Sequence, residues 1–285
     1  MSRSGHLQDL DGGSTTSVIV YQPLKQSQRR SSQGSQSRNA SMAGRRQSVT
    51  AQLQRQARRF STAIAPQFTR IEPVTILQKS EYLILKITDT GQITHAVQQY
   101  VMKNAVMFDP VEFELFDQDG FRIMTASLFP DELLLQEGNK KLFSISFGEI
   151  DEMDSACIAK VKHPITGITV YELRELGGSV LIQANTDSLA GTRILTQSVS
   201  LASVLMACGC TFSKEQWSLV KHDKVMVRIT PQQSFFSENS IKVAWNPNCD
   251  NELRVIALAF GLAQMVREAF PSLLHIVKEF RQRRS

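Results

Sequence analysis

The chain has 285 residues, of which 42% are apolar and 21% are charged, and this composition excludes a collagen-like protein, a disulfide scaffold and a wholly disordered chain. Its four cysteines are too few and too unevenly spaced for a disulfide framework, which favours a reducing compartment. The net charge of +5 is unevenly distributed, because the first 70 residues hold 11 Lys and Arg against two acids and the remainder is mildly acidic.

Residues 1–70 are rich in Ser, Gln and Arg and have almost no aromatic residue before Phe60. Such a segment cannot bury enough apolar area to offset the entropy lost on ordering, so we predict a disordered basic N-terminal tail. Its Arg and Ser bias is also found in mitochondrial transit peptides, but Asp9 and Asp11 argue against that alternative. The polar opening lacks the apolar core of a secretory signal, so we expect a cytoplasmic protein.

Three copies of the pattern Arg-Arg-x-Ser lie in this tail, at 29–32, 45–48 and 58–61. Basophilic kinases recognise two arginines upstream of a hydroxyl in an extended segment, so the pattern predicts a basophilic Ser/Thr kinase as a partner. The alternative is chance occurrence in a segment biased toward Ser and Arg. The candidate phosphorylation sites are Ser32, Ser48 and Ser61.

The arginines of the same motifs predict contact with an anionic phospholipid membrane surface, at ~1 kcal/mol for each basic residue near the leaflet. Nucleic acid is an unlikely partner, because no aromatic residues for base stacking are interleaved with these arginines. A solvated linker is the remaining alternative. The candidate lipid contacts are Arg29, Arg30, Arg45, Arg46, Arg58 and Arg59.

From Ile71 onward, short apolar runs alternate with turn residues, which is typical of strands in a meandering all-β domain. The Asp-Gly within 117–120 lies between two alternating runs and predicts a hairpin. Two stretches have two interpretations: 130–135 is a helical turn or the loop before a strand, and 199–208 is a strand or a buried helix. The predicted strands cover 82–87, 111–116, 121–126, 141–147, 156–161, 169–173, 180–184, 193–197, 217–220, 224–229 and 241–245.

The pattern changes after Asp250, which is a candidate helix cap. We predict a helix over 251–269 that is apolar on every face between Leu253 and Val266, except at Arg254 near the start and Gln264 near the end. A helix that is apolar all round is buried on all sides. The apolar run is nevertheless shorter than the ~20 residues that span a bilayer, so we predict no transmembrane segment.

Pro271 separates this helix from a second, amphipathic helix predicted over 272–283. Many strands followed by one fully buried helix favour a β-sheet that closes around the helix. We therefore predict a mainly β domain over 71–285, a closed antiparallel barrel around a buried C-terminal hydrophobic helix.

The run 241–245, followed by Asp250 and the apolar stretch 254–270, resembles the last strand, acidic turn and closing helix of the phospholipid scramblases. The hairpin over 111–126 resembles an early hairpin of the same group. The whole pattern is similar to the tubby C-terminal-like superfamily, which includes the scramblases, the tubby proteins and the plant LURP-one-related proteins. The resemblance implies a barrel around a central helix and a scramblase-like role at lipid surfaces.

Chemical motifs are sparse in this sequence. The pair Cys208 and Cys210 lacks the second ligand pair of a zinc site, so no metal or cofactor is predicted. None of the five histidines shares a motif with a nucleophile, and neither Gly-x-Ser-x-Gly nor His-Glu-x-x-His occurs. We therefore expect no catalytic residues and no enzyme.

Together these observations favour a lipid-surface binding protein, scramblase-like, cytoplasmic and peripheral to a membrane, with a phosphorylatable basic tail. The first alternative is a non-enzymatic adaptor that binds a protein partner, and the second is a nucleic-acid-associated regulator. Vesicle binding that depends on anionic lipid and falls with salt would distinguish lipid binding from the adaptor.

Overall fold

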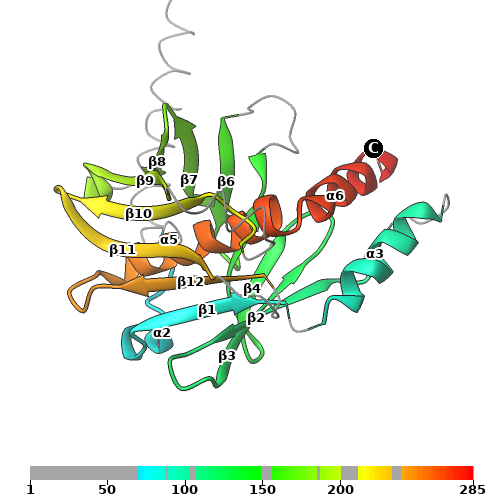
Figure 1. Ribbon diagram of the computed structural model, residues 1–285, viewed down its shortest axis with the longest axis horizontal. Helices are drawn as coiled ribbons and strands as arrows, with labels where there is room; N and C mark the ends of the chain where they lie inside the picture. Colours follow the sequence, from blue (N-terminus) through cyan, green and yellow to red (C-terminus); the bar gives the residue numbers. More distant parts are fainter. Residues whose placement is uncertain are drawn as a thin grey trace, which may run out of the picture. The chain divides into compact units, whose positions relative to one another are not determined.

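The structure is a computed structural model, and it describes residues 70–87, 89–102, 107–148, 156–184, 187–199, 211–232 and 239–284. These residues form a closed antiparallel barrel with a helix through its centre (Figure 1). The predicted mainly β barrel around a buried C-terminal helix is therefore confirmed. The predictions for the tail concern residues outside the described ranges.

Twelve strands in the described ranges follow one another in simple up-and-down order around the barrel. Each strand pairs with its neighbours in sequence, and β1 closes the barrel by pairing with both β2 and β12. The strands are β1 (Tyr82–Lys86), β2 (Val111–Phe116), β3 (Arg122–Leu128), β4 (Leu133–Glu137), β5 (Lys140–Ser146), β6 (Cys157–Lys162), β7 (Thr169–Leu176), β8 (Ser179–Ala184), β9 (Thr192–Ser198), β10 (Glu215–Lys221), β11 (Lys224–Gln232) and β12 (Ser240–Trp245).

The alternation of apolar and polar residues sets which side of each strand faces the barrel interior. In β1, Leu83 and Leu85 are fully buried, while the residues between and beside them face outward. At the closing seam, Leu83 lies opposite Val243 and Leu85 lies opposite Ile241, so apolar side chains from both strands meet inside. Because the sheet closes on itself, no strand of the barrel is left with an unpaired edge.

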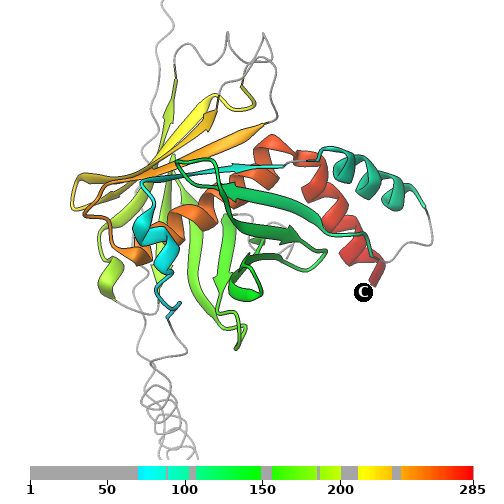
Figure 2. The ribbon, with the colours of Figure 1, turned by 90° about the horizontal axis from the view of Figure 1, so that it is seen from below.

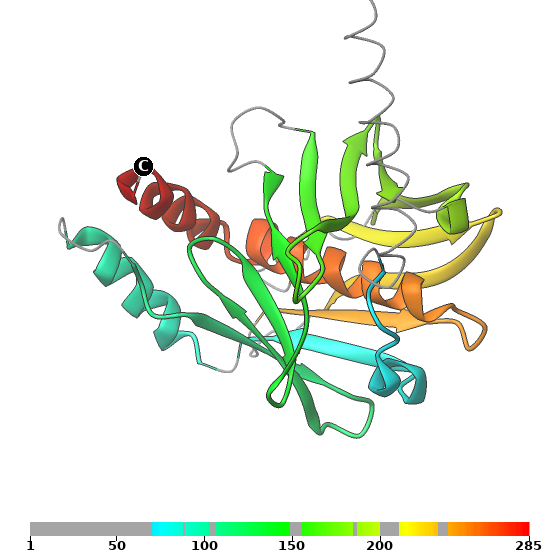
Figure 3. The ribbon, with the colours of Figure 1, turned by 180° about the vertical axis from the view of Figure 1, so that it is seen from behind.

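Helix α5 (Asn251–Gln264) fills the barrel interior, as Figures 1 and 3 show. All twelve residues from Leu253 to Gln264 are buried. Gly261 lies where the helix comes close to the wall, since a methyl group added there would lie 3.1 Å from Val243 Cγ2. Trp217 of β10 packs edge-on against Phe260 at 5.7 Å between ring centroids. Protein therefore occupies the interior, and a ligand would have to bind on the outer wall or at the barrel ends.

The helix predicted over 251–269 widens near its end, because η4 (Met265–Ala269) is a turn of π-helix. Phe270 leaves helical geometry, and α6 (Pro271–Arg284) begins at the following proline, which has no N–H to continue the preceding helix. Helix α6 lies beside α3 (Gly91–Val101) at one end of the barrel (Figures 1 and 2). None of the helices in the described ranges is long and apolar enough to cross a membrane.

The structure contains three elements that the sequence does not clearly predict. Helix α2 (Thr75–Lys79) is a single turn, too short to show periodicity, and α3 (Gly91–Val101) begins without a side-chain cap. The ambiguous stretch 130–135 leads into β4, which pairs with β5 through a turn at Gly138, where φ is +57°. Most of the other ambiguous stretch, 199–208, lies outside the described residues.

Candidate functional site

The site residues predicted from the tail have no place in the described structure. They comprise the three candidate phosphorylation sites and the six candidate lipid contacts. All of them lie outside the described residues: Ser32, Ser48, Ser61, Arg29, Arg30, Arg45, Arg46, Arg58 and Arg59. A candidate site in the structure must therefore be formed by the described residues alone.

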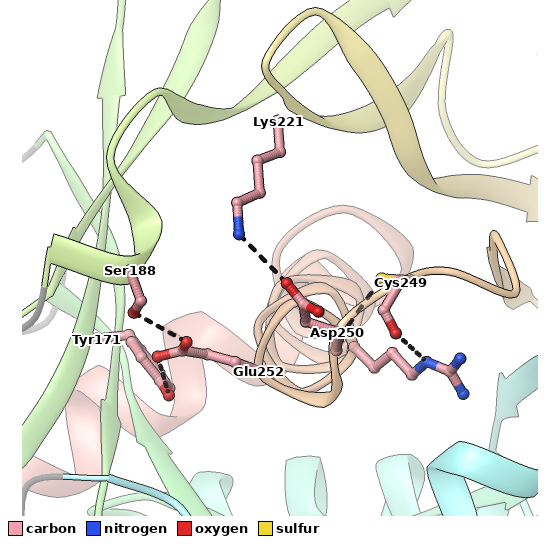
Figure 4. A network of polar contacts seen from close by, with 7 residues as sticks. Tyr171, Ser188, Lys221, Cys249, Asp250 and Glu252 are labelled. Atoms are coloured by element: carbon pink, nitrogen blue, oxygen red, sulfur yellow. Dashed lines mark hydrogen bonds and ion pairs between the residues drawn. The ribbon is translucent and has the colours of Figure 1, made fainter.

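A polar network surrounds the start of α5 at one mouth of the barrel (Figure 4). Glu252, in the first turn of α5, accepts hydrogen bonds from the Tyr171 hydroxyl of β7 at 2.9 Å and from Ser188 Oγ at 3.0 Å. Lys221, at the end of β10, lies 3.2 Å from Asp250 Oδ2. Carboxylates at a helix N-terminus also interact favourably with the helix dipole. Three parts of the barrel thus anchor the beginning of the central helix.

Arg254 is the charged residue that the sequence shows within the apolar helix, and it is only 6% exposed. Its Nε donates to the Cys249 carbonyl at 3.1 Å, and its terminal nitrogens donate to the carbonyls of Leu77 and Pro247. The guanidinium also lies over the Trp245 ring, 5.3 Å from the centroid. Carbonyl oxygens and a ring face thus replace water around this buried cation.

The chemistry of this network suits anchoring of the central helix better than catalysis. Burial raises the pKa of the Cys249 thiol to about 11, despite the nearby Arg254, so the thiol is protonated at neutral pH and is a poor nucleophile. Burial and the adjacent Glu252 carboxylate raise the pKa of Tyr171, which keeps its hydroxyl a hydrogen-bond donor. In the described ranges, no three His, Cys, Asp or Glu side chains gather as a metal site requires.

A half-buried carboxylate, that of Glu268, lies at the opposite end of the central helix. Burial raises the pKa of Glu268 in η4, and the nearby Glu215 and Glu175 carboxylates raise it further. A hydrogen bond from the Ser213 side chain and the charge of Arg267 act in the opposite direction. The ionised form of Glu268 therefore costs stability in the folded protein at neutral pH.

We expect Glu268→Gln to stabilise the protein at neutral pH. Because the folded-state pKa lies above the unfolded value, the wild-type protein should gain stability as the pH falls from neutral through the folded-state pKa, and the variant should lose that gain. Thermal unfolding at neutral and mildly acidic pH should show a midpoint a few degrees higher for the variant at neutral pH only. Glu112→Gln, at an exposed position of β2, is the control. A lower midpoint for Glu268→Gln at neutral pH would contradict the prediction.

The outer wall formed by the adjacent strands β1, β12 and β11 carries basic residues and no acid. The register places Ala244 opposite both Tyr82 and Arg228, so these three form one row across the wall. Lys242 lies two residues before Ala244 on β12 and is a diagonal neighbour of Arg228. We call this surface the cationic wall. Its basic residues are Lys86, Lys224, Arg228 and Lys242.

Aromatic rings hold two of these lysines against the wall. Lys242 Nζ lies 3.7 Å from the centroid of the Tyr82 ring, and Lys86 Nζ lies 4.4 Å from that of Phe116. Each contact is a cation–π interaction, which leaves the charge of the ammonium group in place. The positions of both charges are therefore defined by aromatic side chains of the wall (Tyr82) and of the adjacent strand β2 (Phe116).

Three basic residues of the wall have no ion-pair partner among the described carboxylates. Among the residues that the structure describes, no carboxylate lies within ion-pair distance of Lys86, Arg228 or Lys242. Glu114 lies opposite Lys86 on β2, but it is paired with Arg122 at 2.6 Å. The wall therefore presents positive charge that an anionic partner could bind.

Arg228 lines two hollows of the outer surface, one within the cationic wall and one that continues onto β9 and β10. The first, about 280 Å³, is lined by β11 and β12. The second, about 230 Å³, is lined by β9, β10 and β11 and includes the polar side chains of Gln216, Ser218 and Thr230. A guanidinium with hydroxyl and amide groups beside it can donate several hydrogen bonds to a phosphate or carboxylate. The arrangement therefore suits an anionic group such as a phosphate or a carboxylate.

Sequence reasoning missed the cationic wall because its members lie far apart in the chain, from Lys86 to Lys242. The predicted strands nevertheless contained a signal for the cationic wall. In the predicted strands 82–87, 224–229 and 241–245, basic residues occupy positions that alternate with buried apolar ones. The missing information was which strands are neighbours, and that depends on barrel closure between β1 and β12.

Comparison of the chain with protein-family models, with curated proteins and with solved structures finds no match. The resemblance to the tubby-like superfamily therefore stays a prediction, and the function has to be argued from the geometry of the described residues.

Proposed function

We propose that this protein binds anionic lipid surfaces through the cationic wall, with the basic tail adding attraction. The observation that carries the proposal is the acid-free wall of β1, β12 and β11, on which Lys86, Arg228 and Lys242 lie outside ion-pair distance of every described carboxylate. Lipid phosphates are good ligands for such a surface, because Arg binds phosphate oxygens with two parallel hydrogen bonds and Lys supplies a point charge.

In this proposal the attraction comes from both parts of the chain, the cationic wall and the tail. Three basic residues near an anionic leaflet supply ~3 kcal/mol, which orients a protein but holds it weakly. The tail carries 11 basic residues and two acids, a net charge of +9, and increases the attraction without a specific geometry. Anionic lipids are concentrated on the cytoplasmic leaflet, so the proposal places the protein peripherally at that surface. A scramblase-like movement of lipid between leaflets is the finer form of the proposal and is supported by the sequence resemblance alone.

We expect the triple variant Lys86→Gln, Arg228→Gln and Lys242→Gln to bind phosphatidylserine vesicles about a hundredfold more weakly than wild type, because three interactions of ~1 kcal/mol are lost. Cosedimentation of the full chain with phosphatidylcholine vesicles of graded phosphatidylserine content measures this. Wild-type binding should fall as salt is raised, since exposed charges are screened.

A matched control removes the same charge from another wall. Lys140→Gln, Lys160→Gln and Lys162→Gln change β5 and β6, where Lys140 pairs with Glu72 and Lys160 lies opposite Glu172. This variant should keep most of the binding. Equal losses in both triple variants would show that net charge, and not the cationic wall, determines binding. If the wild-type chain does not bind anionic vesicles, lipid binding is refuted and the adaptor alternative is favoured.

A further inference from the structure

The end of α3 exposes an apolar surface that the other described residues leave largely uncovered. Ile93, Val97 and Val101 are spaced four residues apart and form one stripe along the helix. Ile93 packs against the core, whereas Val97 is 37% and Val101 is 69% exposed. Met102 and Met107, which follow the helix, are 66% and 60% exposed. We call Val97, Val101, Met102 and Met107 the α3 tip.

The α3 tip is held in place by aromatic packing between α3 and α6. Tyr100 contacts His275 and Phe280 of α6, at 5.9 Å and 6.3 Å between ring centroids. Phe108, next to the tip, contacts the same Phe280 at 5.1 Å. Figures 1, 2 and 3 show the two helices side by side and extending away from the barrel. The apolar residues are therefore presented on a fixed support, which reduces the entropy cost of binding.

Basic residues of α6 lie beside the α3 tip. Arg283 donates from Nη1 to the Tyr100 carbonyl at 3.1 Å, and its guanidinium lies 4.9 Å from the Tyr100 ring centroid. Tyr100 directly precedes Val101, so this cation is adjacent to the most exposed residue of the stripe. In the last turn of α6, Arg284 is paired with Asp131 at 2.7 Å and Arg281 donates to the Pro130 and Asp131 carbonyls, so Arg283 is the arginine of this turn that lies against α3. An apolar surface bordered by an arginine is typical of segments that bind the interface of an anionic membrane.

We propose that the α3 tip inserts into the interfacial region of an anionic bilayer, with Arg283 at the level of the lipid phosphates. This inference rests on the proposed function and adds a second, apolar contact to the cationic wall. Two observations favour a bilayer as the partner: Arg283 complements lipid phosphates, and Lys86 at the end of β1 lies eleven residues before Val97, where the tip begins. The tip and one edge of the wall therefore belong to neighbouring parts of the chain.

Tryptophan fluorescence can test the insertion directly in the full chain. Val101→Trp places a reporter in the tip, while the native Trp217 and Trp245 are only 2% and 7% exposed and should be shielded. With phosphatidylcholine and phosphatidylserine vesicles whose acyl chains carry bromine, we expect a blue shift and quenching of the new tryptophan. The control is Ile165→Trp, because Ile165 is 83% exposed in the turn between β6 and β7, at the opposite end of the barrel. This variant should bind vesicles without the additional quenching.

A second pair of variants tests the contribution to affinity. Val101→Asp should bind the same vesicles about tenfold more weakly, because insertion of a valine side chain is lost and a carboxylate is repelled. Ile165→Asp adds the same charge away from the tip and should bind about as well as wild type.

The outcomes separate this inference from the proposed function. Vesicle binding by Val101→Trp without bromine quenching would overturn insertion and leave the cationic wall as the binding surface. No vesicle binding by the wild-type chain would overturn both proposals. A blue shift without vesicles that grows with protein concentration would overturn insertion in favour of a second copy of the chain covering the tip.

Discussion

We expect Ala257→Asp to prevent the protein from folding. Ala257 is fully buried in the middle of α5, where the helix is enclosed by the barrel wall. A carboxylate at this position would lose its hydration without gaining a partner, and such a penalty approaches the ~5–15 kcal/mol that stabilises a whole domain. Gly261→Glu should have the same effect, with the added problem that its side chain would meet Val243 of β12.

Soluble yield, circular dichroism and thermal unfolding measure this outcome. Ala190→Asp is the matched control, because it makes the same chemical change at an exposed position after η3 (Asp187–Leu189). The control should fold with a midpoint close to that of the wild type. A soluble Ala257→Asp variant with a cooperative transition near the wild-type midpoint would contradict the enclosure of α5 by the barrel.

Phosphorylation of the tail should weaken vesicle binding by a factor of roughly a thousand or more. Ser32, Ser48 and Ser61 lie within the segment that carries the net charge of +9. Each phosphate adds roughly −1.5 to −2 at neutral pH, so three phosphates cancel half or more of that charge. At ~1 kcal/mol for each lost charge, the attraction falls by ~4–6 kcal/mol while the cationic wall is unchanged.

Partitioning of the full chain onto anionic vesicles, before and after treatment with a basophilic kinase, measures the effect. The triple Ser→Ala variant should bind like unmodified wild type with or without the kinase. The triple Ser→Asp variant should lose less affinity than the phosphorylated protein, because each Asp supplies only about −1. Equal partitioning of phosphorylated and unmodified chains at low salt would exclude the switch and leave the tail as a linker.

Much of the barrel could be predicted from the sequence because the determining signals are local. Alternation with a period of two marks the strands, and the observed β2 coincides with the predicted 111–116. The central helix is predictable for a different reason: residues 253–263 are apolar on every face apart from Arg254, so only a surrounding wall can bury them all. Helix α3 escapes prediction, because its stripe of Ile93, Val97 and Val101 is incomplete and its packing surface is supplied by α6.

The sequence by itself determined most of the strands and the enclosed helix, and through that helix the barrel around it, because hydrophobic periodicity reports which face of each element is buried. Only the tertiary structure decided which outward-facing residues become neighbours. Barrel closure places Lys86 beside the strand of Lys242, and backbone carbonyls from two separate segments, Leu77 in one and Pro247 and Cys249 in the other, make a buried site for Arg254. The periodicity of a strand does not indicate which residues of other strands lie beside its outward-facing side chains. Contacts across a sheet depend on register and strand order rather than on distance along the chain.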